Sequence, residues 1–186
     1  MRVIAGTARS LKLTAPKGME VRPTTDRIKE TLFNILSPDI YGAVFLDLFC
    51  GSGAIGIEAL SRGANKCVFV DASDTSLACT KANLEHTKLA DRAVVLRREA
   101  ASAVVKLAGD RFDIVFMDPP YGKQLEKQVL EHMARYDILS DNGIVIVEAD
   151  AATEFDYLQE LGFEAYRVKN YGSNKHVFIK KEGERH

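Results

Sequence analysis

The sequence predicts an α/β fold with a seven-stranded, mostly parallel sheet that is covered by helices and ends in an antiparallel hairpin. Two observations predict this fold. Apolar runs rich in Val, Ile and Phe alternate with segments whose apolar residues recur at helical spacing, which is typical of parallel strands joined by crossover helices. The last two apolar runs are instead joined only through Gly172-Ser173-Asn174, which indicates a hairpin.

Length and composition indicate the class of protein. The 186 residues, 46% of them apolar, suffice for one domain with a sizeable core and a small appendage. We expect no transmembrane helix and no signal peptide, because the chain lacks a run of about 18 apolar residues and an N-terminal apolar segment. The three cysteines form no CxxC pair and the four histidines, expected at or near the surface, show no ligand spacing, so no metal site is predicted. Unpaired thiols are typical of the cytoplasm.

Charge is distributed unevenly along the chain, although the net charge is only −1. Residues 1–36 carry a balance of +4, residues 37–166 of −9, and residues 167–186 of +4. An acidic centre suits a cationic small molecule, and basic ends suit a polyanion such as RNA. The alternative, that both ends are merely solvated, remains open. We divide the chain into an RNA-facing N-terminal part, 1–38, and a main domain, 39–186.

The N-terminal part begins with a short extended segment. Residues 2–6 and 11–13 can pair as a hairpin before Pro and Gly residues interrupt the pattern. Arg9 and Arg22 belong to a series of basic side chains along this segment. Contacts with phosphates need such side chains, because neutralising phosphates releases counterions.

A helix is predicted over residues 26–37. Thr24 or Thr25 can cap its N-terminus. Its apolar residues recur at helical spacing and form one face: Ile28, Leu32, Ile35 and Leu36. Arg27 and Lys29 point away from that face. Capping alone does not explain two adjacent threonines beside basic residues, so a role in ligand binding stays open.

A buried strand at Val44–Leu48 leads into a glycine-rich loop that opens the next helix. Gly51, Gly53 and Gly56 match the pattern G-x-G-x-x-G, and Asp71 lies at about the expected distance beyond it. Glycines here let the backbone approach a ligand and direct amide groups toward it. Binding of a dinucleotide such as NAD is therefore one alternative.

The next two strands, 67–71 and 93–96, end beside groups that suit a nucleoside. Asp71 ends the first strand, where a carboxylate can accept hydrogen bonds from both hydroxyls of a ribose. After the second strand, Glu99 can accept from an adenine amino group and the Ala100 amide can donate to the ring. The alternative for both acidic residues is helix capping or a favourable interaction with a helix dipole.

The strand predicted at 112–117 ends abruptly in the tetrapeptide 118–121, Asp-Pro-Pro-Tyr, because proline cannot donate to a strand ladder. The tetrapeptide therefore lies at the carboxyl end of a central strand, where open α/β sheets bind ligands. Asp118 and the Pro119 carbonyl can accept both hydrogens of a planar NH2 group while the Tyr121 ring stacks on its face. The alternative is that Asp118 caps the next helix and Tyr121 packs on the surface.

The remaining segments complete the sheet. We expect a helix over 123–136, a turn at 142–143, a strand at 144–148, a short helix over 154–161, and hairpin strands at 163–171 and 176–181.

Together these segments resemble the class I methyltransferases, which have a Rossmann-like fold and use S-adenosylmethionine. The resemblance implies S-adenosylmethionine as cofactor and S-adenosylhomocysteine as product. A tetrapeptide of the Asp-Pro-Pro-Tyr type marks members of this superfamily that methylate an exocyclic or amide nitrogen. The cofactor residues implied are Asp47, Gly51 and Gly53 for the methionine part, Asp71 with Ala72 for the ribose, Glu99 and Ala100 for the adenine, and Asp118.

A closer resemblance, over nearly the whole chain, is to the bacterial RsmD family, which methylates N2 of one guanine in 16S ribosomal RNA. It is carried by residues 2–6, by 22–34 with its Arg-Pro-Thr-Thr-Asp-Arg run, and by 47–53. The chain departs from the family pattern in the residues after Arg9 and at Glu99. The catalytic residues implied are Asp118, Pro119 and Tyr121, and the substrate-binding residues implied are Arg9, Arg22, Thr25, Arg27, Lys29, Pro120 and Tyr121.

By this resemblance we expect a cytoplasmic monomer acting on 16S rRNA or on an assembly particle of the small ribosomal subunit. Hydrogen bonds from guanine N2 to Asp118 and the Pro119 carbonyl would strengthen as positive charge builds on that nitrogen. Tyr121 would stack on a base held out of its own stack. Alternatives are methylation of adenine N6 in DNA or RNA, methylation of a protein glutamine, an NAD-dependent oxidoreductase, and a non-catalytic RNA-binding module for ribosome assembly.

Overall fold

The computed structural model describes residues 1–16 and 25–183. In these ranges the strands are β1 (Val44–Leu48), β2 (Lys66–Asp71), β3 (Ala93–Arg97), β4 (Phe112–Met117), β5 (Leu139–Asp150), β6 (Phe163–Asn170) and β7 (Asn174–Lys181). The α-helices are α1 (Asp26–Ile35), α2 (Ala54–Ser61), α3 (Asp74–Thr87), α4 (Ala100–Lys106) and α5 (Leu125–Arg135). Short 3₁₀ helices lie at Ala90–Arg92 and Gln159–Leu161.

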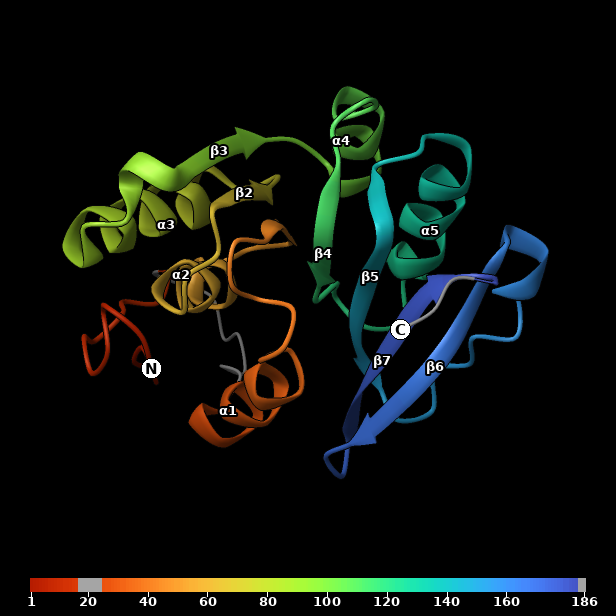
Figure 1. Cartoon of the computed structure of the whole chain (residues 1–186), viewed down its shortest axis with the longest axis horizontal. Coiled ribbons are helices and arrows are strands. Elements are labelled where there is room, and N and C mark those ends of the chain that lie inside the picture. The colour runs from red at the N-terminus through yellow and green to blue at the C-terminus, as the bar shows by residue number, and fades with distance from the viewer. Residues whose placement is uncertain (17–24, 184–186) are drawn as a thin grey trace.

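The strands form one sheet in the order β3-β2-β1-β4-β5-β7-β6 (Figure 1). Pairing is parallel from β3 to β5 and antiparallel on both sides of β7. The predicted Rossmann-like α/β fold, a seven-stranded and mostly parallel sheet with a terminal antiparallel hairpin, is thereby confirmed. No helix of the described ranges is long and apolar enough to cross a membrane.

Helices cover both faces of the sheet, α1, α2 and α3 on one side and α4 and α5 on the other (Figure 1). Side chains of a strand alternate between the faces, so Phe116 packs in the core under the first group while Met117 packs in the core under the second. Because the central strands are buried on both sides, they are almost continuously apolar. This is why the apolar runs located the strands well.

Two predictions of local structure were wrong. Asn142 and Gly143 form no turn but lie inside β5, where Asn142 has a φ of 59° and the pairing with β4 shifts its register. The irregularity that the sequence suggested was a turn lies within the strand, because β5 advances five residues between Leu139 and Ile144 while β4 advances two between Phe112 and Ile114. The helix expected over 154–161 is only the 3₁₀ turn Gln159–Leu161, because Leu158 alone is fully buried in this segment and no apolar stripe supports a longer helix.

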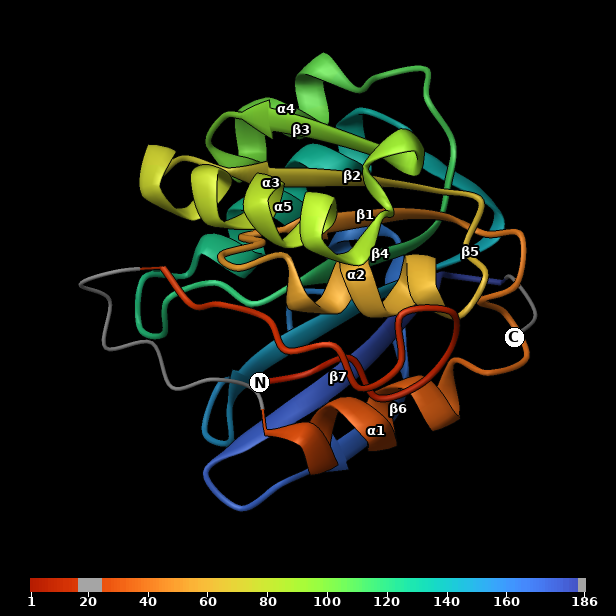
Figure 2. The same ribbon diagram turned by 90° about the vertical axis from the view of Figure 1, so that its left-hand side faces the viewer.

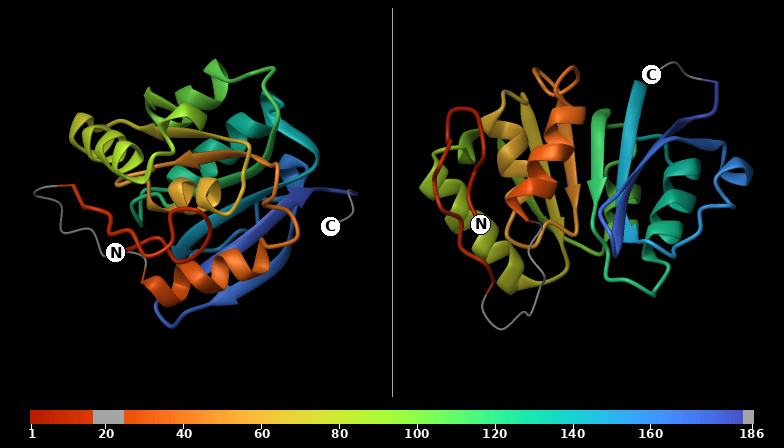
Figure 3. Two further views of the ribbon diagram at one scale, coloured as in Figure 1. Left: turned by 60° about the vertical axis from the view of Figure 1, so that its left-hand side comes forward. Right: turned by 90° about the horizontal axis from the view of Figure 1, so that it is seen from below.

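The N-terminal segment folds against α2, as Figures 2 and 3 show. The expected hairpin is reduced to one antiparallel bridge between Arg2 and Lys12. At Gly6, where φ is +83°, a Cβ atom would lie 1.8 Å from the Ser61 carbonyl oxygen, so only glycine permits this approach. Val3 and Ala8 belong to the same hydrophobic core as the helices on that face of the sheet.

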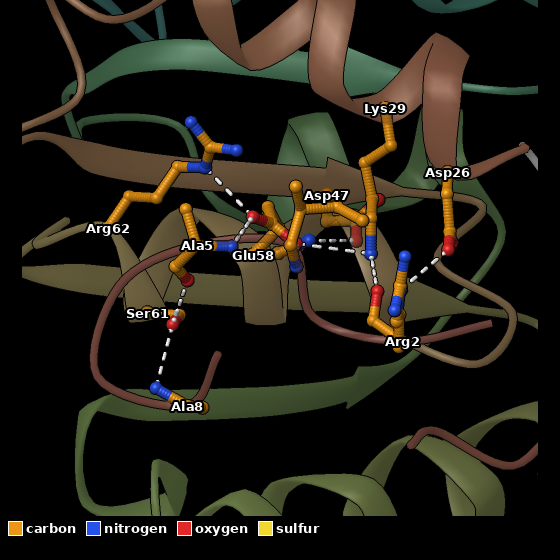
Figure 4. A network of polar contacts seen from close by, with 11 residues as sticks. Arg2, Ala5, Ala8, Asp26, Lys29, Asp47, Glu58, Ser61 and Arg62 are labelled. Carbon is orange, nitrogen blue, oxygen red and sulfur yellow. Dashed lines mark hydrogen bonds and ion pairs between the residues drawn. The ribbon is translucent and has the colours of Figure 1, made fainter. Parts of the chain in front are cut away.

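A buried glutamate on α2 holds this segment in place (Figure 4). The Glu58 carboxylate accepts hydrogen bonds from the Ile4 amide at 2.8 Å and the Ala5 amide at 3.0 Å. Arg62, one turn further along α2, forms an ion pair with it at 2.8 Å. The N-terminal segment is thus tied to the helix that the glycine-rich loop opens.

Candidate active site

A cavity of about 670 Å³ opens at the carboxyl ends of the parallel strands. At or just after the end of each strand from β1 to β5, one residue lines its wall: Gly51, Asp71, Glu99, Asp118 and Glu148. Among residues 1–16 and 25–183, no group of three or more His, Cys, Asp or Glu side chains could hold a metal ion.

The glycine-rich loop presents bare backbone to this cavity. Gly51 has a φ of +55°, and a Cβ atom built on it would meet no atom within 4 Å, so its open side is accessible to a ligand. Its amide donates to the Asp71 carboxylate at 2.9 Å, which holds the loop against the end of β2. The loop therefore fits the close backbone approach expected of a cofactor's methionine end.

Asp47 and Gly53 do not line the cavity, contrary to the expectation of direct cofactor contacts. Asp47 is only 2% exposed, and its carboxylate accepts from the Gly56 amide at 2.9 Å. Burial, with a smaller contribution from the charge of Asp71, raises the pKa of Asp47 to about 7. Gly53 stands at the N-cap of α2. Both residues shape the loop from behind.

Asp71 sits at the cavity wall next to Ala72. One of its oxygens accepts from Gly51 and the other accepts from the Ser73 amide at 2.8 Å. Ser73, not Asp71, caps α3, through a hydrogen bond from the Ser76 amide at 3.3 Å. Each carboxylate oxygen has two lone pairs, so Asp71 keeps the capacity to accept from two hydroxyl groups.

Glu99 and Ala100 both line the cavity at the start of α4. Glu99 occupies the N-cap position, but its side chain makes no capping hydrogen bond. Helix capping therefore does not explain this carboxylate. Its contact with an adenine amino group stays a prediction that the geometry permits.

The tetrapeptide lines the opposite wall, directly after β4. Asp118 does not cap the next helix, because α5 begins at Leu125 with Gln124 at its N-cap. Burial, followed by the charges of Glu148 and Asp47, raises the pKa of Asp118 well above its ordinary value. Tyr121 is 48% exposed and lines the cavity, as stacking on a bound base would require.

Two residues of this wall were not found from the sequence. Glu148 is 5% exposed and accepts from Asn174 Nδ2 at 2.7 Å and from His176 Nε2 at 3.1 Å. His176 is completely buried, so its expected surface position was wrong. An acidic residue closing an apolar strand was the available signal for Glu148, as it was for Asp71. Asn174 offered no signal, because it was assigned to the hairpin turn.

The residues expected to bind substrate are not equally placed. Thr25 caps α1, accepting from the Ile28 amide at 3.3 Å, and also lines the cavity. Pro120 lines it as well. Arg9 and Arg27 are exposed but do not line the cavity. Arg22 lies outside the described residues.

Lys29 corrects the expectation of a substrate contact. Its side chain is completely buried, and its ammonium lies 3.1 Å from the Glu58 carboxylate and also donates to the Arg2 carbonyl (Figure 4). It shares a helix face with Phe33 and Leu36, which follow at spacings of four and seven residues and are buried. A phosphate cannot reach it, so its charge serves the fold.

A smaller cavity of about 340 Å³ lies at the opposite, amino-terminal ends of the strands. Three acidic residues line it, Asp39, Asp113 and Asp141. Asp113 is committed to the fold, because its carboxylate accepts from the Val44 amide at 2.8 Å and from the Ser140 hydroxyl at 2.6 Å. The larger cavity gathers the residues predicted at the strand ends and is the candidate active site.

Comparison with known proteins identifies the relatives of this chain. Residues 1–180 match the family described as "Conserved hypothetical protein 95". Ribosomal RNA small subunit methyltransferase D of Haemophilus influenzae is 36% identical over 152 residues, which cover 81% of this chain and 79% of that protein. The Escherichia coli (strain K12) protein of the same name is 36% identical over 150 residues, covering 81% and 75%.

Similar solved structures share the fold over nearly all of the chain. The Escherichia coli protein yhhF, described as a candidate methyltransferase, is 33% identical with a TM-score of 0.84, and the match covers 98% of both chains. The Haemophilus influenzae protein HI0767, described as a candidate methylase, is 31% identical with a TM-score of 0.81 over 97% of both chains. On these matches, the chain belongs to the RsmD family, that of ribosomal RNA small subunit methyltransferase D.

Proposed function

We propose that the protein transfers a methyl group from S-adenosylmethionine to N2 of one guanine in 16S rRNA. Membership of the RsmD family gives the class of enzyme, an S-adenosylmethionine-dependent rRNA methyltransferase. One observation carries the assignment to this site: Asp118 and Tyr121 share a single cavity with Gly51, Asp71 and Glu99. An amine-binding tetrapeptide thus faces a set of groups suited to a nucleoside cofactor.

The cavity suits this cofactor in size and in charge. Its volume of about 670 Å³ lies within the usual range for small-molecule sites. The open backbone of Gly51 would hold the methionine part, Asp71 the ribose hydroxyls, and Glu99 with the Ala100 amide the adenine. The surrounding carboxylates favour a cationic ligand. When bound, S-adenosylmethionine supplies a reactive methyl group on a positively charged sulfur.

The chain's own residues would position and activate the amine. The lone pair of guanine N2 is delocalised into the ring, so this nitrogen is a poor nucleophile. Asp118 and the Pro119 carbonyl would accept its two N–H bonds and orient it, and these hydrogen bonds strengthen as positive charge develops. Stacking of the base on Tyr121 would contribute about 1–3 kcal/mol. The proton then leaves to Asp118 or to water.

Residues 1–38 would form the RNA-facing part. Thr25 lines the cavity, and Arg27, two residues further along the same helix, is exposed to solvent. Arg9 is exposed on the N-terminal segment. These side chains can contact the RNA backbone while the target base, out of its stack, enters the cavity. A ribosomal substrate would place the reaction in the cytoplasm.

The proposal is tested with S-adenosylmethionine labelled in its methyl group. The protein is incubated with naked 16S rRNA and, separately, with small-subunit particles from cells lacking the activity. We expect label in N2-methylguanosine at a single position, and the more reactive of the two substrates identifies the physiological one. Label in N6-methyladenosine or in a ribosomal protein would overturn the assignment to guanine.

A further inference from the structure

The wall of the cavity beside Asp118 is built from hydrogen-bond acceptors. Met117 of β4 pairs with Val147 of β5, so Asp118 and Glu148 occupy matching positions one residue beyond that pair. Neighbouring strands lie about 4.8 Å apart, and residues at matching positions point to the same face. Two carboxylates therefore stand side by side at the carboxyl end of the sheet, and both line the cavity.

Glu148 is held rigidly by its neighbours on β7. His176 lies directly opposite it in the antiparallel pair and contacts it through Nε2 at 3.1 Å. The other ring nitrogen of His176 lies 3.2 Å from the Tyr171 hydroxyl. A neutral ring that donates to Glu148 can thus accept from Tyr171. Asn174 donates to the second oxygen of Glu148 at 2.7 Å. Each oxygen keeps one lone pair for a ligand.

The same wall contains an acceptor without a donor. Because Asn174 donates its NH2 group to Glu148, its carbonyl oxygen Oδ1 points away from Glu148. Oδ1 is buried and makes no hydrogen bond within the described part of the chain, although Asn174 is only 7% exposed and lines the cavity. Buried polar atoms nearly always have partners. The unpaired oxygen therefore indicates that the wall around Glu148 has more hydrogen-bond acceptors than the described residues have donors to satisfy.

The purine bases differ in what they would bring to these acceptors. On its Watson–Crick edge guanine carries two adjacent donor groups, N1–H and the N2 amino group, beside the acceptor O6. Adenine carries its donors on N6, but its N1 is an acceptor, which a carboxylate would repel. Sites built to bind an N–H group reject analogues that lack it, because the buried acceptor is then left unpaired.

We propose that Glu148 selects guanine over adenine by accepting the hydrogen bond from guanine N1–H, next to the N2 group held by Asp118. This inference rests on the proposed function and adds a specificity residue to it. Asn174 and His176 act as positioning residues that hold the Glu148 carboxylate. The N–H donors of the base also offset the repulsion between the two neighbouring carboxylates.

The test replaces the target guanine by 2-aminopurine, which keeps the amino group at C2 but has an unprotonated N1. The base is introduced by ligating a synthetic oligonucleotide into 16S rRNA, which is then used naked or reconstituted into small subunits. Methyl transfer is measured as kcat/KM on both RNAs. The wild-type protein is expected to prefer guanine on the order of 100-fold.

The variant Glu148→Gln keeps the shape of the side chain and can turn an NH2 group toward an unprotonated N1. It should lower kcat/KM on guanine about 10- to 100-fold and leave the value on 2-aminopurine unchanged or raised. 2-Aminopurine also lacks the oxygen at C6, which affects the wild-type protein and the variant alike. The ratio of kcat/KM on guanine to kcat/KM on 2-aminopurine, compared between the two proteins, therefore isolates the effect of residue 148. Glu126→Gln is the matched control, since Glu126 is a buried glutamate on α5 that does not line the cavity. It should keep the wild-type ratio.

Three results would count against the inference, and they differ in meaning. Equal activity of the wild-type protein on guanine and 2-aminopurine overturns the role of Glu148 without any variant. Equal losses on both RNAs in Glu148→Gln, with an unchanged melting temperature, reduce Glu148 to a general support of the site. No transfer by the wild-type protein to guanine in either form of the RNA rejects the proposed function itself, and this inference with it.

Discussion

The ammonium group of Lys29 lies 3.1 Å from a carboxylate oxygen of Glu58, and neither side chain is exposed to solvent. The ammonium also donates to the Arg2 carbonyl, and the carboxylate accepts from the amides of Ile4 and Ala5. Helices α1 and α2 and the N-terminal segment therefore meet at one buried ion pair (Figure 4). Through α2, this pair fixes the N-terminal segment relative to the glycine-rich loop at the candidate active site.

Replacing one partner of this pair should destabilise the protein strongly. Lys29→Met leaves the Glu58 carboxylate buried with Arg62 as its one remaining ion-pair partner among the described residues. Loss of one partner of a buried ion pair costs about 3–5 kcal/mol, and we expect the free energy of unfolding to fall by about the lower value. Urea denaturation measures it. Lys81→Met, at an exposed position of α3, is the control. Equal effects of both substitutions would show that the pair adds no stability.

Asp118→Asn should separate catalysis from cofactor binding. Asparagine keeps an acceptor oxygen but loses the charge that stabilises a developing positive charge on the amine. We expect the single-turnover rate of methyl transfer to fall by on the order of 100-fold or more, as for loss of an electrostatic contact in other transition states. The dissociation constant for S-adenosylmethionine, measured by calorimetry, should hardly change. An unaltered rate would remove Asp118 from the mechanism.

Asp71→Ala should weaken cofactor binding. The substitution removes the acceptor that holds the Gly51 and Ser73 amides as well as the proposed ribose contact. We expect the dissociation constant for S-adenosylmethionine to rise at least about tenfold, because buried donors are left unpaired. Asp74→Ala is the control, since Asp74 is exposed and pairs only with exposed Arg97 among the ion pairs of the described residues.

Titration of the wild-type protein with NAD tests the alternative that the glycine-rich pattern binds a dinucleotide. We expect no binding of NAD. Tight NAD binding, or an unchanged affinity for S-adenosylmethionine in Asp71→Ala, would contradict the assignment of this wall to the cofactor's ribose.

Asp47→Asn should raise stability in a pH-dependent way. Burial raises the pKa of Asp47 to about 7 in the folded protein, whereas an unfolded chain releases this proton near pH 4. The stability associated with the protonated carboxyl is therefore complete below about pH 4 and is lost as the pH rises toward 7. Asparagine does not titrate, so the variant should gain stability over the wild type at pH 8 and none near pH 4.

Urea denaturation at both pH values measures this gain, which is expected on the order of a few kcal/mol. Asp113→Asn is the comparison, because that carboxylate holds strand β4 to its neighbours through two hydrogen bonds. An equal difference between Asp47→Asn and the wild type at pH 4 and pH 8 would show that Asp47 is charged in the folded state.

Much of the fold followed from short-range patterns. The position of β4 came from an apolar run that two prolines terminate, and the cap of α1 was expected at Thr24 or Thr25, of which Thr25 is the cap. The stretch at Asn142 misled, because a left-handed residue suits a turn and a bulge equally well. The residues expected at the strand ends do gather around one cavity, apart from Asp47 and Gly53, which lie behind the loop.

The amino-acid order was therefore sufficient for the approximate positions of the parallel strands, the glycine-rich loop and the Asp-Pro-Pro-Tyr tetrapeptide, because each depends on neighbours within a few residues. The partners of the buried charges were not accessible in this way. Lys29 pairs with Glu58, and Glu148 pairs with Asn174 and His176, at sequence separations of 26 or more. Strand register and helix packing decide which charged groups lie next to each other. In the protein interior, where polarity is low, a charge that is paired in this way stabilises the fold, and a charge that faces the cavity is available to a ligand.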